Sequence, residues 1–163
     1  MEPQIMQSGI IEAEILEREA FSVVGLKYRG QNESGEEIAY LWKELAEGLE
    51  GIEGPFTPKS AYGVIDNYDD ESAEFEYVAG FAVGEPYHVP LGMARWEIPQ
   101  QTWAVFRCTS ACIDETYREI YKVWLPQSGY KRAEGPEFEQ YSTDFLKGED
   151  DAEVRICIPI KEA

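Results

Sequence analysis

Two segments of helical periodicity, each set among strand-like runs, constrain the fold of this chain more than any other feature. In both segments apolar residues recur at intervals of three and four, which is typical of one buried helix face. They are Ile38, Leu41, Trp42, Leu45 and Leu49 in the first segment, and Ile113, Tyr117, Ile120, Tyr121 and Trp124 in the second. Runs rich in β-branched and aromatic residues lie around them, at 21–28, 60–66, 74–83, 102–108, 138–142 and 152–160. The predicted order of elements is βαββ followed by βαββ.

The two units also correspond in sequence without a gap. A shift of 79 residues places Trp42 on Tyr121 and Tyr62 on Tyr141, and it places Ser60 on Glu139. Element order and loop lengths agree under the same shift, which chance matches rarely achieve. We therefore predict an α+β fold of two βαββ units related by a pseudo-two-fold axis. The sheets should be antiparallel, with the helices packed on one side and a ligand groove between the units.

Length and composition fit one domain spanning residues 1–163. The chain has 44% apolar and 13% aromatic residues, enough to bury a core and to exclude a disordered polyanion. The predicted parts are an N-terminal extension with a lead-in strand, a first half, a crossover rich in proline and glycine, and a second half. They occupy residues 1–20, 21–83, 84–99 and 100–162.

The charge of the chain restricts its partners. It carries 32 acidic residues against 14 lysines and arginines, a net charge of −18. Such a surface repels the phosphates of nucleic acids and anionic membranes, and it favours cationic partners. No apolar run approaches the length that spans a bilayer, and the first residues lack the pattern of a signal peptide. We expect a cytoplasmic protein that does not bind membranes.

The residues that usually hold metals are few. Cys108, Cys112 and Cys157 are odd in number and are expected to be reduced thiols. His88, the single histidine, falls in the crossover, where we expect a loop residue. Since no second cysteine pair completes a zinc site, we predict neither a metal nor a cofactor.

The run Gly135 to Tyr141, GPEFEQY, places a carboxylate between aromatic rings. In a strand Glu137, Glu139 and Tyr141 share one face, while Phe138 and Gln140 share the other. If the first face lines the groove, Glu139 must become protonated, recruit a partner or await a cation, because an isolated buried carboxylate costs several kcal/mol. The alternative is an outward face on which the acid is simply solvated.

Several segments together resemble the GyrI-like effector-binding domains, which occur alone or fused to DNA-binding domains of AraC-type and MerR-type regulators. The segments are FSVVGL, IAYLWKEL, YVAGFAV, TWAVFRC, IYKVWLPQSGYKRAEGPEFEQY and VRICIPI. The resemblance covers about residues 10–161, and WLPQSGY with GPEFEQY is its most specific part.

The resemblance implies an aromatic-lined pocket with one acid that meets cationic or amphipathic molecules. It assigns the acid to Glu139 and aromatic pocket residues to Tyr141, Tyr77 and Trp103. Trp42 and Tyr121, on the apolar faces of the two helices, either line the groove or fill the core. We interpret Trp124, at the end of its helix, as a core residue.

Two functions agree with these residues. The first is a stand-alone binding module for cationic or amphipathic aromatic, drug-like compounds. The alternative, also taken from the resemblance, is a hydrolase of reactive electrophiles such as cyclopropane-type alkylating toxins, in which Glu139 is a general base and Tyr141 or Tyr77 donates a proton. Antagonism of a protein such as a topoisomerase is a third possibility, so enzyme activity stays open. No helix-turn-helix pattern precedes the module, so we expect no direct nucleic-acid binding, and any protein partner is unknown.

Overall fold

The computed structural model describes residues 4–8, 11–32, 35–49, 60–83, 89, 91–142 and 152–163. The strands are β1 (Gln4–Ser8), β2 (Ile11–Arg18), β3 (Phe21–Gly30), β4 (Ser60–Asp66), β5 (Phe75–Val83), β6 (Ala94–Ile98), β7 (Gln101–Thr109), β8 (Tyr130–Arg132), β9 (Glu137–Ser142) and β10 (Glu153–Glu162). The helices are α1 (Glu36–Leu49), α2 (Ile113–Glu119) and α3 (Leu125–Gln127). His88 lies outside the described residues, so its predicted loop position is untested.

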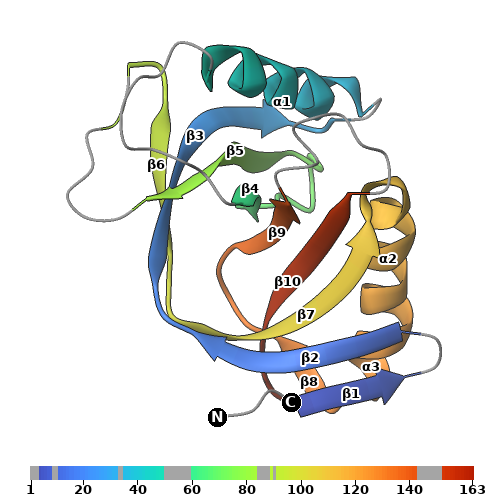
Figure 1. Ribbon diagram of the computed structural model, residues 1–163. Coiled ribbons are helices and arrows are strands. Elements are labelled where there is room, and N and C mark those ends of the chain that lie inside the picture. Colours follow the sequence, from blue (N-terminus) through green and yellow to red (C-terminus); the bar gives the residue numbers. More distant parts are fainter. Residues whose placement is uncertain are drawn as a thin grey trace.

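One antiparallel sheet connects the two predicted units (Figure 1). Its strand order is β1-β2-β7-β10-β9-β4-β5-β3-β6, with β8 paired to β10. The central pair, β4 and β9, is antiparallel, and the order β7-β10-β9 on one side repeats as β3-β5-β4 on the other. Farther out, β2 flanks β7 as β6 flanks β3. The predicted α+β fold with two related βαββ units is confirmed.

The uniform shift of 79 residues, however, is wrong for two of the three strand pairs, β3 with β7 and β4 with β9. For β5 with β10 it holds, since Tyr77 and Ile156 both lie on the helix side. Leu26 of β3 and Ala104 of β7 both join the core on the helix side, so equivalent positions in these strands lie an even number of residues apart. An odd shift reverses the face on which every side chain lies. Ser60, which the shift places on Glu139, points to the opposite face, where its hydroxyl accepts a hydrogen bond from Gln140. The residue paired with Glu139 is Gly63.

Both helices pack on one face of the sheet, as predicted. In Figure 1, α1 lies over β3 and β5, and α2 lies beside β7. Leu41 and Leu45 of α1 and Ile120 and Trp124 of the second helical segment belong to one core cluster. Trp124 is 0% exposed, with its ring centroid 5.0 Å from that of Phe106, which confirms the interpretation of this tryptophan as core.

The opposite face carries a second apolar core. Val23, Val64, Trp103, Phe138 and Cys157 are buried there. The long β2–β3 and β6–β7 segments bend around this side of the molecule (Figure 1). The three cysteines are free thiols.

The two helical segments have local irregularities near their ends. At the start of α1, the side chain of Asn32 accepts a hydrogen bond from the backbone N–H of Ile38 at 3.1 Å. The second helical segment passes through a π-helical stretch, Ile120–Trp124, and ends at Gln127. In a π-helical turn each backbone hydrogen bond spans five residues instead of four, which interrupts the regular α-helical pattern there. In the described part of the chain, no helix combines the length and apolar character needed to cross a membrane.

Candidate functional site

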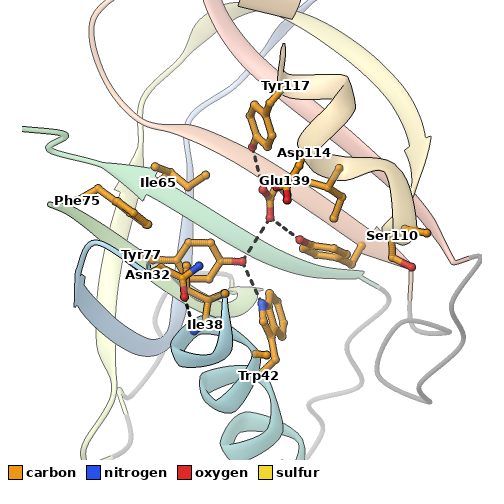
Figure 2. A pocket seen from close by; sticks show the side chains of 15 residues that line it. Asn32, Ile38, Trp42, Ile65, Phe75, Tyr77, Ser110, Asp114, Tyr117 and Glu139 are labelled. Atoms are coloured by element: carbon orange, nitrogen blue, oxygen red, sulfur yellow. Dashed lines mark hydrogen bonds between the residues drawn. The ribbon is translucent and has the colours of Figure 1, made fainter. Parts of the chain in front are cut away.

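A cavity of about 600 Å³ opens on the helix side of the sheet, between α1 and α2 (Figure 2). The first half contributes Ile38 and Trp42 from α1, Ile65 from β4, and Phe75 and Tyr77 from β5. The second half contributes Ser110, Asp114 and Tyr117 from the helical segment, and Glu139 and Tyr141 from β9. The cavity thus lies where the sequence places a groove between the two units.

Glu139 lies in this cavity and is 6% exposed. Three phenols surround its carboxylate (Figure 2). The hydroxyl of Tyr117 donates to Oε2 at 2.9 Å, that of Tyr77 to Oε1 at 3.4 Å, and that of Tyr141 also to Oε1. The Tyr77 hydroxyl in turn accepts a hydrogen bond from Trp42 Nε1 at 2.9 Å. Residues of both halves therefore meet at one carboxylate.

Burial dominates the electrostatics of this acid. Loss of solvation raises the pKa of Glu139 to about 7, although the hydrogen bonds from Tyr141, Tyr117 and Tyr77 oppose the rise. Within the described residues, none of the hydrogen bonds that Glu139 accepts comes from a cationic side chain. Burial and the nearby carboxylate also raise the pKa values of Tyr77, Tyr117 and Tyr141, so these phenols remain protonated donors at neutral pH.

Aromatic rings form the wall of the cavity next to Glu139. The ring of Trp42 meets that of Tyr141 edge-on, with centroids 5.2 Å apart, and that of Tyr77 at 6.4 Å. Edge-to-face contacts at such separations are favourable because the positive edge of one ring meets the negative face of the other. The four predicted residues Glu139, Tyr141, Tyr77 and Trp42 therefore lie together.

Gly63 makes room for this arrangement from the central strand β4. A Cβ atom there would lie 2.1 Å from the Tyr77 hydroxyl oxygen and 3.1 Å from Glu139 Oε1. Any other residue would therefore displace the phenol. Gly63 was not predicted as a site residue, although a glycine inside the strand run SAYGVID is a signal of close approach by another group.

Tyr121 belongs to a separate cluster around the second acid of β9. Its hydroxyl donates to Glu137 Oε1 at 2.9 Å, and Arg132 Nη2 lies 3.4 Å from the same oxygen. Burial raises the pKa of Glu137, while the Arg132 guanidinium opposes the rise. Tyr121 is not among the residues that line the cavity.

Trp103 is likewise not brought to the cavity. It is 1% exposed on the opposite face of the sheet, where its ring centroid lies 4.8 Å from that of Phe138. Neighbouring Ala104 faces the helices instead. Tyr117, by contrast, contacts Glu139 directly. From the sequence it was predicted only as part of the apolar face of the second helix, and not as a site residue.

Sequence comparison relates the chain to known proteins. Residues 11–161 match the family model of the GyrI-like small molecule binding domain. The transcriptional regulator BrlR of Pseudomonas aeruginosa is 37% identical over 153 residues, which are 92% of this chain and 56% of that protein. The chain thus spans little more than half of the length of this curated relative.

Solved structures share the fold at low sequence identity. SAV2435 bound to tetraphenylphosphonium has a TM-score of 0.68 at 16% identity, covering 93% of this chain and 94% of that one. An integron cassette protein of Vibrio cholerae has a TM-score of 0.65 at 20% identity, with 91% and 95% covered. EcmrR in a DNA complex has a TM-score of 0.65 at 14% identity, with 93% of this chain and 57% of that one covered. Because a DNA-bound regulator is among them, the expected absence of nucleic-acid binding has no support in these comparisons.

Proposed function

The chain belongs to the GyrI-like small-molecule-binding domain family, and from this premise we propose that it binds cationic or amphipathic aromatic compounds in the cavity between α1 and α2. The observation that carries the proposal is Glu139, a buried carboxylate whose described hydrogen-bond donors are all neutral phenols. A cation that enters the cavity would supply the missing charge partner. The complex of SAV2435 with tetraphenylphosphonium, an aromatic cation, supports this ligand class.

The lining of the cavity suits a broad range of such ligands. Each aromatic ring that faces a cation contributes about 0.5–2 kcal/mol, depending on how far the contact is desolvated. Trp42, Tyr77 and Tyr141 offer such rings beside the carboxylate. Three such contacts contribute about 1.5–6 kcal/mol of the roughly −8 kcal/mol that micromolar affinity requires, and burial of the ligand's apolar surface contributes the remainder. Rings and one charge impose little directional geometry, so specificity should follow size and charge.

Titration with tetraphenylphosphonium, and with neutral triphenylphosphine oxide for comparison, tests the proposal. Glu139→Gln keeps the shape and removes the charge, so it should weaken binding of the cation by about 1–3 kcal/mol and hardly affect the neutral compound. Binding is measured by calorimetry, with tryptophan fluorescence as a second signal that Trp42→Phe should reduce.

The matched control is Glu137→Gln, on the same strand face but paired with Arg132. It should leave cation affinity nearly unchanged. If Glu139→Gln lowers the affinity for both compounds equally, the proposal is contradicted, because such a result indicates damaged packing and not the loss of the charge.

A second candidate is hydrolysis of strained electrophiles such as cyclopropane-bearing alkylating agents. The observation that favours it is the pKa of Glu139, about 7, because a general base works best when its pKa lies near the operating pH. Glu139 would take a proton from water as the water attacks the strained ring, while Tyr77 or Tyr141 protonates the leaving atom. Glu139→Gln should then abolish turnover and leave substrate binding nearly intact, since a base acts mainly in the transition state. Wild-type protein that hydrolyses no such compound above the buffer rate would exclude this candidate.

A further inference from the structure

A second carboxylate lines the same cavity as Glu139. Asp114, in the first turn of α2, is exposed to solvent, whereas Glu139 is buried (Figure 2). The described residues that line the cavity include these two acids and no lysine, arginine or histidine. The cavity therefore carries two negative groups at two depths, with aromatic rings beside the deeper one.

We propose that this cavity prefers aromatic dications, with one cationic centre against Glu139 and the other against Asp114. The inference rests on the proposed function, because it assigns the ligand class within the same site. The cavity volume of about 600 Å³ accommodates a ligand of two or three aromatic rings, since drug-sized molecules occupy pockets of roughly 300–1,000 Å³. One end of such a ligand would be desolvated among rings, and the other would stay in contact with water.

Asp114 also has a structural role that must be separated from this one. Acids in the first turn of a helix interact favourably with its positive end. Glu115 occupies the same first turn of α2 and does not line the cavity. Moreover, the net charge of −18 attracts dications in general. Asp114→Asn and Glu115→Gln remove the same charge from the same turn, so only a direct contact with ligand distinguishes them.

The expected effect is small because Asp114 is exposed. Exposed ion pairs contribute little and are screened by salt, so a contact with Asp114 should improve affinity by about two- to five-fold at low ionic strength, which is about 0.4–1 kcal/mol. The advantage should disappear at about 1 M salt, where the Debye length is about 3 Å.

The test compares ligands that share a ring skeleton but differ in charge. N-Methyl-4-phenylpyridinium is a two-ring monocation, and 1,1′-dimethyl-4,4′-bipyridinium is the corresponding dication. A three-ring bis(pyridinium)benzene and its monocationic analogue extend the distance between charges. Calorimetry at low salt should show at least one dication bound about two- to five-fold more tightly than its monocation. Asp114→Asn should weaken binding of the dication more than that of the monocation and so remove this advantage, while Glu115→Gln should retain it.

Two results would overturn the inference: no dication preferred over its monocation at either length, or equal losses in Asp114→Asn and Glu115→Gln. The proposed function fails separately, if Glu139→Gln leaves binding of the monocation unchanged. Circular dichroism of both α2 variants, expected to match the wild type, establishes that the helix persists in the proteins compared.

Discussion

Glu137 and Glu139 lie two residues apart on one face of β9, yet only Glu137 has a cationic side chain beside it among the described residues. Glu137 shares its Oε1 with the guanidinium of Arg132, at 3.4 Å, and with the Tyr121 hydroxyl. Glu139 accepts hydrogen bonds from three phenols. The negative charge of Glu137 is compensated by a cationic side chain of the protein. The charge of Glu139 meets only neutral hydrogen-bond donors, so a bound cation can still compensate it. This difference is the physical basis for our proposal that Glu139 binds the ligand.

The position of each acid along β9 produces the difference. Arg132 lies on the short strand β8, which pairs with the C-terminal part of β10, and its guanidinium also donates to the carbonyls of Ala133 and Gly135. Glu137, at the start of β9, is within its reach. Glu139 is opposite Gly63 on the central strand, between the two helices.

The largest expected effect is the pH dependence of stability that comes from Glu139, the acid without a cationic partner among the described residues. Burial raises the pKa of Glu139 from 4.5 to about 7, so between these values the folded protein binds a proton that the unfolded chain releases. The free energy of unfolding should therefore fall as pH rises through this window. Compared with Glu139→Gln, the wild type should lose about 3 kcal/mol between about pH 4.5 and pH 8. Urea denaturation of both proteins across this range measures the difference, and parallel curves would contradict the raised pKa.

The next effect breaks the pairing of Glu137. Arg132→Met keeps the aliphatic length but leaves the carboxylate without its cation, which should lower the free energy of unfolding by about 2 kcal/mol. This is less than for a fully buried pair because Arg132 is about one-third exposed. Adding Glu137→Leu should recover part of the loss, but not the two hydrogen bonds to backbone carbonyls. If the double variant is less stable than Arg132→Met alone, the loss of stability does not come from the unpaired Glu137 carboxylate.

The smallest effect changes the geometry around Glu139 without changing charge. Gly63→Ala places a methyl group where the Tyr77 hydroxyl lies, so the phenol must move away from the carboxylate. Affinity for tetraphenylphosphonium should fall by about 1 kcal/mol, the size of one contact between a cation and an aromatic ring. When Gly63→Ala is combined with Tyr77→Phe the colliding oxygen is absent, and the added methyl group should then cost little stability. Unchanged affinity in the single variant would mean that the position of Tyr77 does not matter for the cation.

Much of the site was predictable because it depends on local periodicity. Strand alternation placed Glu139 and Tyr141 on one face, and helical spacing placed Trp42 on the buried side of α1. Tyr77, identified through the family resemblance, lies beside them in the structure. Trp103 lies on the opposite face of the sheet. Strand alternation shows which residues of a strand share a face, but it does not show which face of the sheet meets the helices. The uniform shift failed for β3 and β4 for the same reason, since an offset of one residue exchanges the two faces of a strand.

The amino-acid sequence was enough to predict the order of elements within the two βαββ units, the apolar faces of both helices and the spacing that puts Glu137, Glu139 and Tyr141 on one side of β9, but not strands β1, β6 and β8. These features follow from backbone periods of 3.6 and 2 residues, which act over a few positions. Three features became visible only in the folded chain: Gly63 lies opposite Glu139, Tyr117 and Tyr77 contact Glu139 from different halves, and Arg132 contacts Glu137 instead. Such contacts depend on the register and curvature of a sheet built from distant segments, and the pKa of Glu139 depends on the burial that this assembly creates.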